Sequence, residues 1–165
     1  MVDTQVNKSS PTNFELVFPK IPTESTISAS EELTLNIYGS VIPGLTLDTT
    51  EENWMGSSTQ VPARATYEPW SVDFIVDSQF YNWKVLFNWL TSIHNNKDTY
   101  PGSPDEYKVD ATLRVIDNFQ SEILRIFFVD VWIQALSEVQ FSHRESEVNL
   151  ECNANFAYDR FEIRT

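Results

Sequence analysis

The side chains that most often carry out chemistry in proteins are few and isolated in this chain. His94 and His143 each stand alone, without the HxxxH or HExxH spacing that would present two metal ligands on one face of a helix. Cys152 lies in a run of alternating apolar and polar residues, which predicts a buried, unreactive thiol on a strand. The sequence contains only 4 glycines and no GxSxG motif or Walker loop, so we expect no phosphate-binding loop.

Acidic residues are plentiful, and two carboxylates at a suitable separation could serve as the acid–base pair of a glycosidase. Glu51 and Glu52, and likewise Asp105 and Glu106, fall in stretches that we interpret as loops, where such side chains are usually solvated. We therefore predict no catalytic residue, no metal site and no cofactor. On this interpretation the protein is not an enzyme, and its function depends on its shape and surface.

The chain is strongly acidic, with 11 basic and 24 acidic residues and a net charge of −13. Such a surface repels phosphate, so we do not expect specific binding to nucleic acid. A single cysteine excludes an internal disulfide, and the absence of a long apolar run or signal-peptide pattern suggests a protein assembled inside a cell, without a membrane anchor. We expect a polar N-terminal arm over residues 1–12 and one domain over residues 13–165.

Alternation of apolar and polar residues predicts about seven strands. The clearest runs lie at 70–76, 109–116 and 148–159, and shorter ones begin near residues 13 and 33. The run 122–136 is more continuously apolar, which predicts a strand buried on both faces. Residues 48–58 are expected to form an acidic loop that exposes Trp54 and Met55, and Pro62 is expected to confine residues 59–67 to a broken or edge strand.

The pattern changes from strand to helix spacing after Asp77, whose carboxylate can cap the first free amides of a helix. An aromatic and aliphatic face then recurs at helical intervals, and we expect it to brace a sheet. The fold class predicted is mainly β, an antiparallel sandwich or barrel with one flanking helix. The residues predicted to form its core are Trp70, Phe80, Trp83, Phe87, Leu90, Phe156 and Tyr158.

The order of these segments resembles the tail tube proteins of contractile-tailed bacteriophages, which are related to the tube proteins of type VI secretion systems. The similarity runs from about Asn13 to Ile163 and rests on an ordered set of short motifs, not on one diagnostic motif. The matching positions are the early strand NFELVF, Pro43 and Gly44, Trp70 and Val72, Asp77, Trp83 and Trp89, Tyr107 and Lys108, Trp132, and Phe156, Tyr158 and Asp159.

The resemblance implies a structural virion protein whose hexameric rings stack into the inner tube of a contractile tail. Neighbouring sheets would join edge to edge around a bore, through which DNA passes as cargo without specific binding. The implied partners are further copies of the chain, the tail sheath, and baseplate or terminator proteins, with assembly in the host cytoplasm. A long Ser/Thr-rich stretch at 19–32 and Pro69 before the Trp70 strand depart from the family pattern, which leaves a baseplate-proximal tube protein as an alternative.

From this resemblance and from the alternation in the strands, we expect two functional surfaces, one that lines the bore and one that contacts other subunits. Polar and acidic side chains would line a bore that lets DNA slide, and the candidates are Asp110, Thr112, Arg114, Asn149, Glu151, Asn153 and Asn155. An exposed tryptophan in an acidic loop and a nearby strand end would contact other subunits or rings. The candidates for these contacts are Ile42, Pro43, Gly44, Trp54 and Met55.

Two other functions stay open from the sequence. A type VI-like secretion tube subunit would share the fold and the stacking, and would carry effector proteins in place of DNA. A carbohydrate-binding β-sandwich module would use exposed tryptophans to stack on sugars and would be a soluble monomer.

Overall fold

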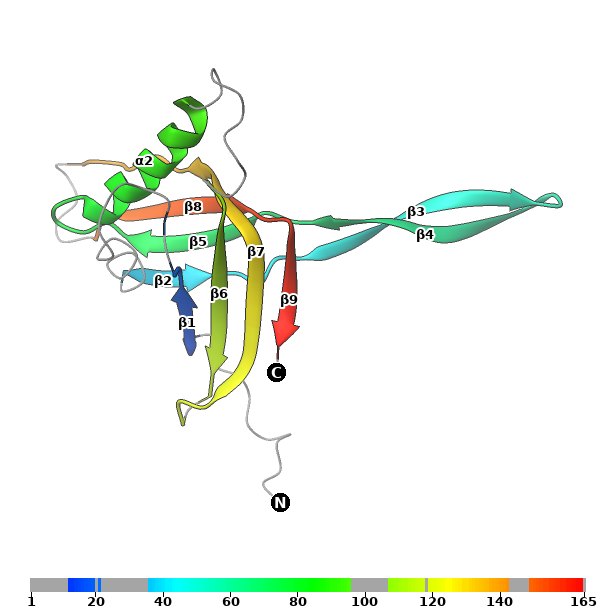
Figure 1. Cartoon of the computed structure of the whole chain (residues 1–165), viewed down its shortest axis with the longest axis horizontal. Coiled ribbons are helices and arrows are strands. Elements are labelled where there is room, and N and C mark those ends of the chain that lie inside the picture. Colours follow the sequence, from blue (N-terminus) through cyan, green and yellow to red (C-terminus); the bar gives the residue numbers. More distant parts are fainter. Residues whose placement is uncertain are drawn as a thin grey trace.

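The computed structural model describes residues 12–19, 21, 36–95, 107–117, 119–142 and 149–164 (Figure 1). Within these residues there are nine strands and one helix. Their bounds are β1 Phe14–Val17, β2 Ile37–Ser40, β3 Leu45–Trp54, β4 Ser57–Tyr67, β5 Trp70–Ile75, α2 Tyr81–Asn95, β6 Val109–Ile116, β7 Glu122–Leu136, β8 Glu151–Ala157 and β9 Arg160–Arg164. Our expectations for His143 and for nearly all of the N-terminal arm and the Ser/Thr-rich stretch lie outside the described residues.

Two antiparallel sheets share the long strand β7 and run across one another (Figure 1). The first half of β7 pairs with β6 and β9, and β6 pairs in turn with β1; we call these strands sheet A. The second half of β7 pairs with β8, which continues through β5 to β2; we call these strands sheet B. The predicted fold class, mainly antiparallel β with one flanking helix, is confirmed.

The burial of β7 differs from the prediction that both of its faces are buried. Ile126 and Phe128 are buried before Asp130, and Val131 and Ile133 are buried after it, so the buried positions change from even to odd numbers. Asp130 has a φ of 58°, a left-handed conformation that inserts an irregularity into the strand. The strand changes its inward face where it passes from sheet A to sheet B. This change, and not burial of both faces, explains the continuous apolar run in the sequence.

Charged side chains hold this bend in β7. The amide of Asp130 donates a hydrogen bond to Asp110 Oδ1 at 3.2 Å. Lys108 Nζ lies 3.8 Å from Asp130 Oδ2 and 3.2 Å from Asp159 Oδ1, and the amide of Asp159 donates to the carbonyl of Val129. Residues from the start of β6, the middle of β7 and the β8–β9 junction thus meet at the corner where the two sheets join.

The hydrophobic core lies between the two sheets. Trp70, Val72 and Phe74 of β5 are buried and alternate with half-buried polar and aliphatic neighbours, as predicted for a half-buried strand. The indole of Trp70 stacks on Phe128 of sheet A with ring centroids 4.2 Å apart, and its Nε1 donates to Ser40 Oγ. Phe156 is buried on the adjacent strand β8, so two of the predicted core residues form the centre of the packing.

The helix buries a different face from the predicted one. Asn82, Val85, Leu86 and Trp89 are its buried residues, and Trp89 Nε1 donates to the carbonyl of Tyr107. Of the predicted face, Phe80, Trp83 and Leu90 are only partly buried, and Phe87 is 42% exposed. The prediction for Phe87 was wrong because aromatic residues surround the first turns of this helix, and apolar spacing alone fits more than one face.

The start of the helix explains which face turns inward. Asp77 accepts hydrogen bonds from the amides of Gln79 and Tyr81, so it caps the segment that leads into the helix, as predicted. A turn lies between Asp77 and Tyr81, the first residue of the helix. The buried Asn82 donates from Nδ2 to the carbonyl of Ile75 at 2.8 Å and accepts through Oδ1 from the amide of Asp77 at 3.3 Å. This side chain ties α2 to the end of β5 and orients the following residues toward the core.

The paired strands β3 and β4 at residues 45–54 and 57–67 were only partly predicted. Most of β3 was missed, because 48–58 was predicted to be an acidic loop, whereas the edge strand predicted at 59–67 corresponds to β4. Pro62 is accommodated because a register shift lies beside it, between the pairs at Leu47 and Thr49. The predicted long final strand ends at Ala157, and the chain turns at Tyr158 and Asp159 to form β9 on sheet A.

Candidate assembly surfaces

The β3–β4 hairpin projects from one end of the molecule as a free two-stranded ribbon (Figure 1). Every residue of β3 is exposed, and the tip presents Trp54 and Met55 with 75% and 94% of their surface exposed. Met55 and Gly56 have φ values of 49° and 82°, which is the pair of positive values that a tight two-residue hairpin turn requires. An isolated two-stranded ribbon is only marginally stable in water, so a contact with another molecule would stabilise it.

One face of the hairpin combines an aromatic and an acidic side chain near the tip. Trp54 pairs with Ser57, and Glu52 pairs with Thr59, so Trp54 and Glu52 lie on the same face. At the base of the hairpin, Ile42 is 53% exposed, whereas Pro43 is buried, and the carbonyl of Gly44 accepts a hydrogen bond from the amide of Glu68. Of the five residues predicted to make contacts, Pro43 and Gly44 therefore shape the root of the hairpin, while Ile42, Trp54 and Met55 are available to a partner.

The outward face of sheet B is polar and carries no basic side chain: neither lysine nor arginine occurs in β2, β5 or β8. Asn153 Nδ2 donates to Ser71 Oγ at 2.7 Å and to Asp73 Oδ1 at 2.6 Å. Tyr38 donates to Glu151 Oε2 at 3.0 Å, and its partial burial together with Glu151 raises the pKa of the phenol. This face is thus a cross-strand network of neutral and acidic groups.

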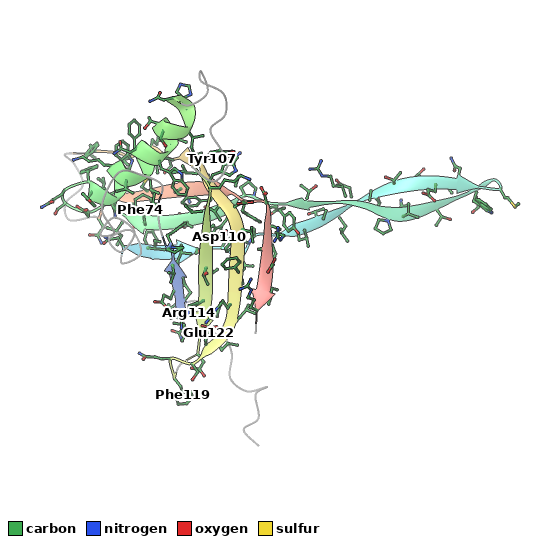
Figure 2. All side chains as sticks on the ribbon, in the orientation of Figure 1. Phe74, Tyr107, Asp110, Arg114, Phe119 and Glu122 are labelled. Atoms are coloured by element: carbon green, nitrogen blue, oxygen red, sulfur yellow. The ribbon has the colours of Figure 1, made fainter. Side chains whose placement is uncertain are left out.

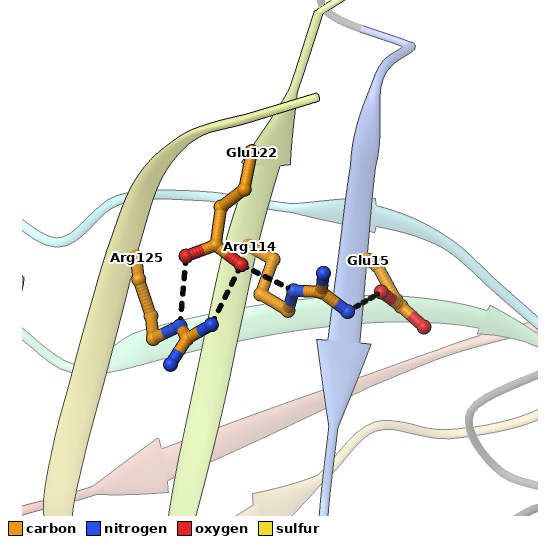
Figure 3. Close-up of polar contacts among 4 residues, drawn as sticks. All are labelled: Glu15, Arg114, Glu122 and Arg125. Atoms are coloured by element: carbon orange, nitrogen blue, oxygen red, sulfur yellow. Dashed lines mark hydrogen bonds and ion pairs between the residues drawn. The ribbon is translucent and has the colours of Figure 1, made fainter. Parts of the chain in front are cut away.

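The outward face of sheet A is instead an ion-pair network, which Figure 2 locates near the β6–β7 turn and Figure 3 shows in detail. Arg114 Nε lies 2.7 Å from Glu122 Oε2, and Arg114 Nη1 lies 2.6 Å from Glu15 Oε2. Arg125 Nε lies 2.9 Å from Glu122 Oε1. The hydrogen bonds from Arg125 and Arg114 lower the pKa of the Glu122 carboxyl.

We expect the substitution Glu122→Gln to lower stability at neutral pH but not in acid. A carboxyl whose pKa is lower in the folded state stabilises the fold above its unfolded pKa, and this contribution is lost as the pH falls through the folded value. The urea midpoint of the variant should therefore lie below that of the wild type at pH 7, and the difference should shrink as the pH falls below the ordinary pKa of a glutamate and through the lowered pKa of Glu122. A difference that stays constant with pH would contradict this role of the network. Because these side chains are exposed, we expect the effect to be small.

The seven residues predicted to line one bore lie on two different sheets. Asp110, Thr112 and Arg114 belong to β6 of sheet A, whereas Glu151, Asn153 and Asn155 belong to β8 of sheet B. Because the buried faces of the two sheets meet at the core, their polar faces point away from each other and cannot form a single wall. Asn149 precedes β8 and is exposed.

The turn between β6 and β7 presents Phe119, whose side chain is 81% exposed at the far end of sheet A (Figure 2). Asp117 Oδ1 accepts hydrogen bonds from the amides of Phe119 and Ser121, which fixes the turn. The sequence analysis did not single out Phe119. An aromatic residue inside a polar turn was the available signal.

The described residues contain no group of three or more His, Cys, Asp or Glu side chains that could hold a metal ion. Cys152 is buried as predicted, and this burial raises the pKa of its thiol. No helix in the described part of the chain is long and apolar enough to span a membrane.

Tyr158, a predicted core residue, is partly buried. This burial raises the pKa of its phenol to about 12, and its hydroxyl donates a hydrogen bond to the carbonyl of Glu68.

Crossed antiparallel sheets, a bracing helix and a long projecting hairpin form a fold that also occurs in contractile injection systems. A chain of the PVC sheath–tube complex, from an extracellular contractile injection system in the extended state, has this fold with a TM-score of 0.67 and 12% identity, covering 99% of this chain and 93% of that one. A chain of the PVC sheath/tube terminator in the extended state has a TM-score of 0.67 and 16% identity, covering 97% and 99%.

The chain belongs to the phage tail tube protein family, whose model matches residues 8–164. It is 31% identical over 166 aligned positions to the tail tube terminator protein of Enterobacteria phage T4, covering 95% of this chain and 89% of the T4 protein. The resemblance noted from the sequence is therefore confirmed at the level of the family. The protein is a non-enzymatic structural component of a phage tail, and so of the virion.

Proposed function

We propose that this protein forms the ring that terminates the tail tube of a contractile phage tail. The observation that carries the proposal is the 31% identity over nearly the full chain to the T4 tail tube terminator protein, whereas the chain of the PVC sheath–tube complex shares the fold at only 12% identity. The sequence-based interpretation favoured the main tube subunit, with a baseplate-proximal protein as the alternative; a terminator is a third position on the same tube.

The topology of sheet B supports ring closure by strand pairing. Its order is β7-β8-β5-β2 with every neighbour antiparallel, so β2 and the second half of β7 are its end strands and run in opposite directions. Among the described residues, no strand covers the outer edge of β2 or the outer edge of residues 132–136. When β2 of one copy lies beside β7 of the next, the pair is again antiparallel, and the sheet continues around a closed ring without unpaired edges.

The polar face of sheet B is then the wall of the bore. Its acidic and amide side chains, which include Asp73, Glu151, Asn153 and Asn155, offer no cation to a passing phosphate. A duplex would be repelled weakly from all sides and could slide. The arginine-containing face of sheet A, with Arg114 and Arg125, would point away from the bore toward the tail sheath or a capping partner. We propose that the rings assemble in the host cytoplasm.

A main tube subunit is the second candidate, because a chain of the PVC sheath–tube complex and a chain of the PVC sheath/tube terminator match this fold with the same TM-score of 0.67. Electron microscopy of the purified, concentrated protein separates the two. A terminator should form single rings that bind to the ends of preformed phage tubes and do not stack. Long tubes formed by this protein alone would favour the main tube subunit, and a persistent monomer would reject both.

The substitution Trp54→Ala should weaken contacts between subunits without unfolding the protein. Trp54 is 75% exposed at the hairpin tip, so the isolated subunit loses little packing when it is removed. If the tip is buried in the assembly, loss of an aromatic anchor of this size costs about 2 kcal/mol or more per contact. Sedimentation velocity should show rings dissociating at higher protein concentration than the wild type, while the thermal unfolding of the subunit stays the same. If the variant assembles as well as the wild type, the hairpin tip is not part of the interface.

A further inference from the structure

An exposed aromatic surface covers the outer side of the helix. Trp83 stacks on Phe87 with centroids 5.0 Å apart, Phe80 meets the edge of Trp83 at 6.5 Å, and Phe141 stacks on Phe80 at 6.0 Å. Phe87 and Phe141 are 42% and 76% exposed. We call these four residues the aromatic face. Phe80 and Trp83 are partly buried against the core, whereas Phe87 and Phe141 extend the stack into solvent, away from the buried helix residues Val85, Leu86 and Trp89.

The charge of this region differs from that of the rest of the molecule. In a chain of net charge −13, the fifteen residues of α2 contain no aspartate or glutamate. Lys84, which is exposed, follows Trp83 directly. The indole Nε1 of Trp83 is buried and has no hydrogen-bond partner in the described structure, which leaves a donor without an acceptor inside the stack. A ligand that carries apolar groups together with carboxylates would suit this surface.

The hairpin of the same chain has that chemistry. Its tip carries the exposed Trp54 and Met55, and Glu52 lies on the same face as Trp54. Asp48 and Glu51 add further negative charge to β3. Methionine sulfur and an indole ring both pack favourably against aromatic side chains, and the carboxylates complement Lys84.

We propose that the hairpin tip of one copy docks on the aromatic face of the next copy. Within one molecule the two surfaces lie at opposite ends of the long axis, so a chain cannot satisfy itself (Figure 1). A contact between different surfaces of successive copies is heterologous, and such contacts close into rings when the rotation between copies permits. This inference rests on the proposed ring assembly and names the receptor for the tip within it.

Disulfide trapping between two variants, each with one introduced cysteine, tests the contact. Ser57→Cys lies opposite Trp54 at the tip, and Asn88→Cys lies on the exposed side of the helix next to Phe87. Both variants retain Cys152, which is buried and unavailable. After mixing under assembly conditions and mild oxidation, the Ser57→Cys and Asn88→Cys proteins should form a covalent heterodimer. The matched control replaces the second variant by Phe119→Cys, which is also an exposed site and lies at the β6–β7 turn, and it should give little product.

Charge-reversal variants provide a second test of the docking contact. Lys84→Glu in the Asn88→Cys protein should slow trapping by about fivefold, and Glu52→Lys in the Ser57→Cys protein should restore it. Rings that form normally but give no more product with Asn88→Cys than with Phe119→Cys would overturn the docking contact and leave the proposed ring function standing. A protein that never assembles, judged by sedimentation of the wild type alone, would overturn the ring function and the docking contact together.

Discussion

Replacement of Trp70 by alanine is expected to lower the free energy of unfolding by about 3–5 kcal/mol, a large share of the stability of a domain of this size. The Trp70 side chain has no exposed surface and packs parallel to Phe128, with ring centroids 4.2 Å apart and an interplanar angle of 10°. It also contacts Phe18 and Phe156. Its loss would leave a cavity where the two sheets meet, and urea denaturation followed by circular dichroism would measure the result.

Two variants make this test specific. Trp70→Phe keeps an aromatic ring in the stack but removes the Nε1 donor to Ser40 Oγ, so it should cost clearly less than the alanine variant. Trp54→Ala removes an equally large side chain from the exposed hairpin tip and should leave subunit stability close to that of the wild type. If the three variants were equally stable, the two sheets would not share the core that Trp70 occupies.

The contrast between Trp70 and Phe87 shows which parts of the fold could be predicted. In β5 the period of two allows only one inward face, so alternation placed Trp70, Val72 and Phe74 correctly. On α2 nearly every side of the first turns carries an aromatic residue, and apolar spacing could not choose between them. The choice depends on Asn82, a polar residue whose two hydrogen-bonding groups both find partners in the backbone around the end of β5. Burial of a polar side chain at such a junction leaves no periodic signal.

The strand β3 and the hairpin turn were missed for a different reason. Every residue of β3 is exposed, so no apolar alternation marks this strand, and its acidic and hydroxyl residues are typical of a loop. The one local signal was Gly56 after Met55, which permits the tight turn.

The sequence also could not show that the predicted bore residues are divided between two sheets. Alternation assigns each polar residue to a strand face, but the position of that face follows from the bend at Asp130, a residue with no special composition around it.

The assignment of the sheet B face to the bore predicts that one substitution would convert a channel for DNA into a binding site. Asn155→Lys places a cation on β8, beside Ser71 of β5. In a hexameric ring this adds on the order of six positive charges to the wall, all directed at the axis, with no acidic side chain removed. The assembled variant should retain duplex DNA at low salt, whereas wild-type rings should not. The logarithm of its affinity should fall with the logarithm of salt concentration with a slope of up to about −5.

Thr112→Lys is the matched control, because it adds the same charge to β6 on the outward face of sheet A. Both variants change the net charge of the chain equally, so a general loss of repulsion would affect them alike. If only Asn155→Lys rings retain DNA, the charge acts from inside the bore, where the cations surround one duplex and reinforce each other. Retention by Thr112→Lys rings alone would place sheet A on the bore instead.

The Asn155→Lys substitution should also slow DNA ejection from phage particles, because DNA must leave the tail quickly. Phage that carry this substitution should adsorb normally but eject their DNA more slowly. Potassium efflux or DNA release from purified virions would measure that delay.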